Sequence, residues 1–205
     1  MKVRSILSSA VLVLATAAIT TQVVSQEAKQ PPAMSPEEQA MMQKWMEFAT
    51  PGEHHKALAA KVGNWDVLVK MWMDPAAPAS ESKGNATFEM ALDGRYLMDH
   101  TTGTTDMGPF EGMGCTGYDN LKKKYVAVWI DNMGTGIMYG EGTYDAAKKT
   151  FTYATESPDI ETGKYVKTRS TERWVDNDHW VMESYIAGKD GKEFKQMEIT
   201  YARAK

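Results

Sequence analysis

The chain has 205 residues with 27 acidic and 23 basic side chains, and its formal net charge at pH 7 is −4. No stretch is basic enough to attract nucleic-acid phosphates, since the one lysine cluster, residues 122–124, falls in a predicted turn. The single cysteine, Cys115, excludes an intramolecular disulfide, so core packing and sheet closure must hold the fold. We interpret Cys115 as a small buried side chain in a strand, with a reactive thiol as the alternative.

The N-terminus is typical of a signal peptide. Lys2 and Arg4 precede an apolar run over residues 6–19 that is too short to span a bilayer, and small residues follow it. We predict cleavage after Ser25 and export to the periplasm or the extracellular space. Residues 26–34 are polar and contain proline, which predicts a mobile tether. No later segment is long and apolar enough to be a transmembrane anchor.

Two short helices are predicted before the first strand. Ser35-Pro36-Glu37-Glu38 and Thr50-Pro51-Gly52-Glu53 each place proline after a capping residue and glutamate two positions later, which is the pattern of a helix N-terminus. The helices should cover about residues 36–48 and 52–60, so residues 35–60 form an N-terminal helical segment. The first helix carries one broad apolar face: Met41, Met42, Trp45, Met46 and Phe48. We expect this face to dock against the following domain; the alternative is a lid or a protein partner's contact through Met41, Trp45 and Met46.

From Trp65 onward the hydrophobic pattern has period two, and turn signals recur every eight to twelve residues. This pattern predicts about ten strands. Short turns force neighbouring strands to be antiparallel, so residues 61–205 predict an all-β, up-and-down meander that closes into a barrel and so removes its exposed edges. The expected strands are 65–73, 84–92, 95–103, 110–118, 124–132, 137–144, 150–157, 164–174, 179–187 and 193–203.

The two ends of this domain carry a further signal. Gly63-Asn64-Trp65 opens the first strand and Arg203 closes the last one. A Gly-x-Trp opening with an arginine on the last strand resembles the signature of the calycins, the lipocalins and fatty-acid-binding proteins among them. The resemblance implies that Trp65 plugs the barrel floor and that the guanidinium of Arg203 packs across its ring.

Strand parity predicts the residues that face the barrel interior. If Trp65 points inward, methionine and aromatic side chains dominate the interior, with His100 or Glu172 as a polar anchor. Gly112, Gly114, Gly140 and Gly142 leave one face of two strands bare, which indicates sharp bends or the close approach of another group. The predicted ligand-binding residues are Met71, Tyr96, Met98, His100, Trp129, Asp131, Glu172, Met182 and Tyr201.

Signatures of catalysis are absent from the sequence: it has no nucleophile elbow, zinc-protease motif, paired cysteines or phosphate loop. We therefore name no catalytic or metal-binding residue, expect no cofactor, and regard an enzyme as the less favoured class. His54 and His55 are adjacent, so their side chains diverge, and we interpret them as helix surface. His100 could ligate heme iron, although a core histidine is the simpler interpretation.

Several motifs together resemble a group of exported bacterial proteins catalogued as domain-of-unknown-function family 1579. The resemblance covers about residues 35–203 and implies a calycin-like barrel with no established activity. Nitrobindin-type heme barrels are more distant in shape, and their heme-ligating histidine has no clear match here. The motifs are Lys61-Val62-Gly63-Asn64-Trp65-Asp66-Val67, Gly94-Arg95-Tyr96-Leu97, Phe110-Glu111-Gly112, Gly117-Tyr118-Asp119-Asn120 and the run from Trp129 to Gly136.

These observations favour an exported barrel that binds one small apolar or amphipathic molecule. Two alternatives stay open. One is a heme-binding or enzymatic barrel that uses His100. The other is a filled barrel that serves as a structural or protein-interaction module through its methionine-rich helix.

Overall fold

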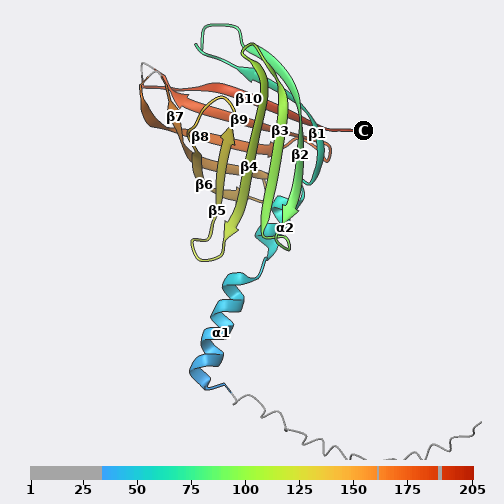
Figure 1. Cartoon of the computed structure of the whole chain (residues 1–205), viewed down its shortest axis with the longest axis vertical. Coiled ribbons are helices and arrows are strands. Elements are labelled where there is room, and N and C mark those ends of the chain that lie inside the picture. Colours follow the sequence, from blue (N-terminus) through green and yellow to red (C-terminus); the bar gives the residue numbers. More distant parts are fainter. Residues whose placement is uncertain (1–33, 161, 189–190) are drawn as a thin grey trace, which may run out of the picture.

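The computed structural model describes residues 34–160, 162–188 and 191–205. In that part of the chain, ten antiparallel strands form a closed barrel in which each strand pairs with its neighbours in sequence and β1 pairs with β10 (Figure 1). The predicted closed up-and-down barrel is confirmed. The strands are β1 (Gly63–Met71), β2 (Ser80–Ala91), β3 (Tyr96–Thr105), β4 (Gly108–Asp119), β5 (Lys124–Asp131), β6 (Met138–Asp145), β7 (Thr150–Asp159), β8 (Lys164–Trp174), β9 (His179–Ala187) and β10 (Glu193–Arg203).

Two of the hairpin turns use the same local chemistry. In the β4–β5 turn, Oδ1 of Asp119 accepts hydrogen bonds from the backbone N–H groups of the residues two and three positions later. In the β6–β7 turn, Asp145 does the same. Both turns then place a lysine, Lys123 or Lys149, at positive φ. An aspartate that caps its own turn sets the loop length, and the loop length sets the pairing of the strands on either side.

Aromatic side chains fill the barrel at the end nearest the helices. Edge-to-face and stacked ring contacts connect them, as expected for close-packed aromatic groups. The buried core consists of Leu58, Trp65, Val67, Ala86, Phe88, Leu97, Tyr125, Phe151, Tyr153, Trp180 and Tyr201.

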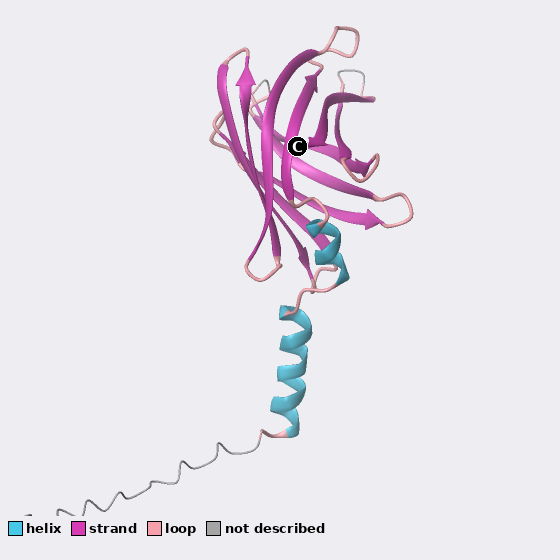
Figure 2. Cartoon of the chain, turned by 90° about the vertical axis from the view of Figure 1, so that its right-hand side faces the viewer, coloured by secondary structure: helices cyan, strands magenta, loops and turns pink. Residues whose placement is uncertain are grey.

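The two helices relate differently to the barrel. Helix α2 (Glu53–Ala59) packs under the β3 and β4 ends and buries Leu58 and His55. The interpretation of His55 as helix surface is therefore wrong, whereas His54 is exposed and stacks on Tyr118 at 3.9 Å between ring centroids. Helix α1 (Pro36–Ala49), which has the predicted serine cap at Ser35, extends away from the barrel and buries none of its residues (Figures 1 and 2).

The expected docking of α1 against its own barrel is thus wrong, and hydrogen bonds at its C-terminal end explain why. The side-chain amide of Asn120 donates to the carbonyl oxygens of Glu47, Phe48 and Thr50 at 3.3, 3.0 and 2.9 Å. Arg95 donates to the carbonyl of Ala49 at 3.0 Å. These bonds satisfy carbonyls that a helix end leaves without partners, and they hold α1 pointing outward.

The predicted signal peptide, residues 1–25, and the tether except Met34 lie outside the described residues. Among the helices that the structure describes, none has the length and apolar character needed to cross a membrane.

Candidate functional site

The barrel floor is built by Gly63, Trp65 and Arg203. Trp65 is fully buried and its indole N–H donates to the carbonyl of Lys61 at 2.8 Å. The guanidinium of Arg203 lies 4.3 Å from the centre of the Trp65 ring and donates to the carbonyl of Val62. Gly63 has φ +133, and a Cβ there would lie 2.7 Å from a guanidinium nitrogen of Arg203. Glycine is therefore needed beside the arginine, and the predicted stack is present.

The structure places six of the nine predicted site residues on the inner face of the barrel. Glu172, Met182 and Tyr201 lie toward the floor half, where cross-strand pairing joins Glu172 to Met182 and Tyr201 to Trp180. Trp129, Asp131 and Met71 lie toward the end remote from α2. Trp129 donates to Oδ2 of Asp131 at 2.9 Å, so these two mouth residues bind each other.

The other three, Tyr96, Met98 and His100, point away from the interior. His100 is half exposed and pairs with Glu111 at 2.8 Å on the outer surface. Placing these side chains inside was therefore wrong, and a heme iron inside the barrel cannot be ligated by His100 in this orientation. The pairing of β2 with β3 explains the outward direction. Ala91 lies on the outer face of β2 and pairs with Tyr96, and cross-strand partners share one face, so Tyr96 also points outward.

With that face reversed, the inward residues of β3 are Leu97, Asp99 and Thr101, and Asp99 is the functional candidate that sequence reasoning missed. Its partners across the sheet are Phe88 and Gly114. A Cβ at position 114 would lie 2.2 Å from Oδ1 of Asp99, so the bare glycine face predicted on β4 leaves room for this carboxyl group. Burial raises the pKa of Asp99 to about 7.

A buried ion pair lies close to Asp99. Lys61, at the junction of α2 and β1, donates to the carboxylate of Glu172, and its side chain is 5% exposed. Its ammonium group also lies 4.7 Å from the Phe151 ring centre and 4.6 Å from that of Trp180. Glu172 was predicted to be a polar anchor on the inner face, and Lys61 is its charged partner. Two carboxyl groups therefore lie near one lysine. Lys61 opposes the burial that raises the pKa of Asp99, and Glu172 adds to the rise.

Two buried donors in this region have no partner. The hydroxyl of Tyr153 and the indole N–H of Trp180 make no hydrogen bond within the described part of the chain, although these residues are only 3% and 2% exposed. Burial raises the pKa of Tyr153 well above its usual value, so its hydroxyl stays a donor. A buried donor without an acceptor carries a desolvation cost of about 1–3 kcal/mol, which an acceptor from water or a ligand would relieve.

Solvent reaches the interior from the end remote from α2. Met71 faces inward at that end and is 44% exposed. Further inside, the Glu172 side chain is 21% exposed, while its cross-strand neighbour Phe151 and Trp65 at the floor are fully buried. The barrel is therefore packed at its floor, and the inner side chains toward the other end are less buried.

Other groups with chemical potential are dispersed. Cys115 lies on the outer face of β4 and is partly exposed, so its interpretation as a buried side chain is wrong; partial burial raises its pKa. No group of three or more histidine, cysteine, aspartate or glutamate side chains that could hold a metal occurs among the described residues.

One solved structure, with a TM-score above 0.5, shares this architecture. Rv2717c from M. tuberculosis has a crystal structure similar to this chain, with a TM-score of 0.56 and 13% identity over 76% of this chain and all of that one. A redesigned β-barrel (TM-score 0.38, 15% identity, 73% and 96% covered) and a designed fluorescence-activating barrel (0.41, 14%, 72% and 97%) also match. No curated protein matches the sequence. The family model of DUF1579, described as a protein of unknown function, matches residues 50–203, so the chain belongs to the DUF1579 family.

Proposed function

We propose that this protein binds one small amphipathic molecule inside the barrel, with a neutral hydrogen-bond acceptor such as a carbonyl oxygen at its polar end. The observation that carries this proposal is the pair of buried donors without partners, Tyr153 and Trp180, in a barrel that solvent reaches from one end. Binding sites of this kind combine apolar walls with a few polar groups that orient the ligand.

The charges around the donors favour a neutral polar end over an anion. Glu172 already matches the charge of Lys61, and Asp99 adds a second carboxyl group without a cation of its own. An anionic end would therefore meet two carboxyl groups and no unpaired cation among the described residues nearby, at a cost in desolvation. A carbonyl oxygen needs only a donor, and Tyr153 and Trp180 each offer one.

Apolar contacts would hold the rest of the molecule. Met182, Ile199 and Val69 line the interior above the ion pair, and all three are partly exposed. The mouth beyond them carries Trp129, whose ring stacks on Phe110 at 6.4 Å between centroids. We propose that Trp129 and Asp131 lie at the entrance of the site.

Fluorescent probes test the proposal directly. Nile red, which is neutral and carries a ring carbonyl, should bind the purified chain at one site with a Kd in the micromolar range, or about −8 kcal/mol. Anilinonaphthalene sulfonate, which is anionic, should bind at least tenfold more weakly, because its sulfonate would lie near the two carboxyl groups.

Matched variants locate the probe. Met182→Trp should abolish binding by filling the interior, whereas Met98→Trp should leave it unchanged, because Met98 lies on the outer face of the same barrel. Tyr153→Phe should weaken Nile red binding about fivefold to tenfold through the lost hydrogen bond. Circular dichroism confirms the fold of each variant. Equal binding to both tryptophan variants would place the probe on the surface and reject the interior site, and absence of all probe binding would favour a filled barrel.

A further inference from the structure

Helix α1 exposes an apolar surface to solvent, which indicates an interaction site. Met41, Trp45 and Met46 are 67%, 61% and 57% exposed, and Met42 extends the same stripe at 49%. We call these four residues the α1 stripe. Contiguous apolar patches of this kind mark interaction surfaces, since isolated exposed side chains are common but stripes are not.

A second apolar surface lies on the outside of the barrel over β3 to β6. Cross-strand pairing joins Met113 to Ile130, Cys115 to Val128, and Val128 to Tyr139. Next to it, between the barrel wall and the α1–α2 junction, is a groove of about 590 Å³. We call it the outer groove; its lining includes Phe48, Tyr96, Cys115, Val126, Val128 and Tyr139.

The α1 stripe of the same chain does not lie in this groove, although Phe48 at the end of α1 forms part of the groove wall. Asn120 and Arg95 bind the carbonyls at the C-terminal end of α1 and hold the helix pointing away from the barrel (Figures 1 and 2). Folding α1 back over β3 to β6 would break these hydrogen bonds. Within the part of the chain that the structure describes, α1 is therefore not the occupant, and we look to another molecule.

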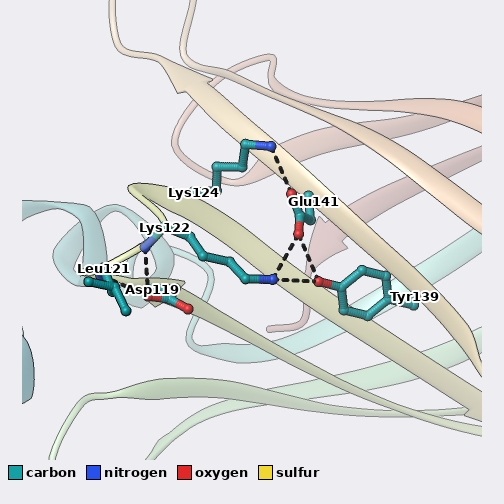
Figure 3. Close-up of polar contacts among 6 residues, drawn as sticks. All are labelled: Asp119, Leu121, Lys122, Lys124, Tyr139 and Glu141. Atoms are coloured by element: carbon teal, nitrogen blue, oxygen red, sulfur yellow. Dashed lines mark hydrogen bonds and ion pairs between the residues drawn. The ribbon is translucent and has the colours of Figure 1, made fainter.

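Charge favours a second α1 as that occupant. Lys122 and Lys124 both bind the carboxylate of Glu141 at the rim of the groove, and Tyr139 donates to the same group (Figure 3). The bond from Lys124 is the largest cause that lowers the pKa of Glu141 to about 2. Among the charged side chains that line the groove itself, Arg95 and Lys122 outnumber Asp119, which leaves an excess of positive charge.

Helix α1 has the opposite excess, because Glu37, Glu38 and Glu47 outnumber Lys44. An acidic helix with an apolar stripe thus matches an apolar groove with a basic rim. The same acidity disfavours an anionic membrane as the partner of α1, since interfacial helices carry basic residues beside their apolar face.

The surface involved is large enough for a stable pair. Four apolar side chains about half exposed present on the order of 400 Å². Two symmetric helix-to-groove contacts, counted on both partners, would bury about 1,600 Å², which is the size of a specific interface. Each copy has one helix and one groove. Two copies related by a two-fold axis therefore satisfy both of each other's surfaces and form a closed dimer.

We propose that two copies of this chain form a symmetric dimer in which each lays its α1 stripe in the outer groove of the other. Sedimentation velocity of the purified chain should show a dimer with a Kd of about 10 µM or tighter. Trp45→Glu on the helix and Val128→Glu in the groove should each shift the protein to monomer. Gln43→Glu, on the polar side of the same helix, should leave the dimer intact.

Cys115 offers a direct test of which surfaces meet, since it is the single cysteine of the chain and lines the groove. One copy carries Met42→Cys together with Cys115→Ser, and an unmodified copy supplies Cys115. After mixing and treatment with a short bismaleimide, a cross-linked peptide that joins positions 42 and 115 should form between the two copies. Gln43→Cys in place of Met42→Cys should cross-link far less.

Three results would overturn the proposal. The first is a monomer at every concentration up to about 100 µM, well above the expected Kd. The second is a dimer that Trp45→Glu and Val128→Glu leave intact, which would place the interface elsewhere. The third is a monomer whose α1 instead binds vesicles of phosphatidylglycerol and phosphatidylcholine, detected as co-sedimentation lost in Trp45→Glu. Circular dichroism of each variant confirms that the barrel stays folded.

Discussion

Replacing Lys61 with methionine should destabilise the barrel strongly. The substitution keeps an unbranched side chain of similar length but removes the ammonium group that binds Glu172 and lies over the Phe151 and Trp180 rings. Glu172 would then be an inward carboxylate without a cation. Removing one partner of a buried ion pair typically costs 3–5 kcal/mol, and the 21% exposure of Glu172 places the expected loss near the lower end, at about 3 kcal/mol.

The assay is urea unfolding at pH 7.5 followed by tryptophan fluorescence, with the change in stability taken from the midpoint and slope. Lys61→Met combined with Glu172→Gln should recover at least about 1 kcal/mol of the loss, because no charge is left unpaired. Lys148→Met is the matched control, since Lys148 pairs with Asp145 on the surface at 78% exposure and should change stability by less than about 0.5 kcal/mol.

A loss below about 1 kcal/mol for Lys61→Met would refute this reasoning. It would mean that Glu172 accepts a proton at little cost when Lys61 is absent, or that water solvates the carboxylate fully. The same conclusion would follow if the double variant were no more stable than Lys61→Met alone.

Three further predictions concern other parts of the barrel. Asp99 has a pKa of about 7 in the fold against the ordinary aspartate value of 3.8 expected in the unfolded chain. The folded protein therefore holds an extra proton between these values and loses stability as pH rises through them. Asp99→Asn should remove that loss, raising stability at pH 8 by up to about 4 kcal/mol and flattening the pH dependence of urea unfolding; a less stable variant at pH 8 would show that the ionised carboxylate has a partner. Trp65→Ala should cost about 3–5 kcal/mol and Trp72→Ala clearly less in thermal unfolding, because Trp65 is fully buried whereas Trp72 lies outside, 5.3 Å from the ammonium group of Lys195; equal losses would contradict the assigned faces. Asn120→Ala should leave the barrel intact but speed hydrogen exchange at residues 46–52, and unchanged exchange there would show that the Asn120 bonds do not hold α1.

Local chemistry in the sequence determined most of the barrel. The turn aspartates Asp119 and Asp145 and the alternation between them specify short hairpins, and successive short hairpins permit only a meander. The barrel floor can be identified from one specific contact. The guanidinium of Arg203 packs on the Trp65 ring, and Gly63 leaves room for it. These features depend on residues close in sequence or on one specific stack, so they can be inferred without the fold.

The candidate site depended on the tertiary structure for two reasons. Strand β3 carries apolar residues on both faces, so its alternation does not say which face is inside, and Tyr96 and Met98 were placed wrongly while Asp99 was missed. Lys61 and Glu172 are 111 positions apart in the chain, and only barrel closure brings the α2–β1 junction to the inner face of β8.

The direction of α1 was likewise decided by contacts between distant segments. Its apolar stripe is equally suited to packing on its own barrel or on another molecule. What holds it away from the barrel is a set of hydrogen bonds from Asn120 to the end of the helix, 70–73 positions earlier in the chain. Hydrophobic periodicity reports which side of a helix is apolar, but the partner of that side is set by geometry that arises only once the strands have paired.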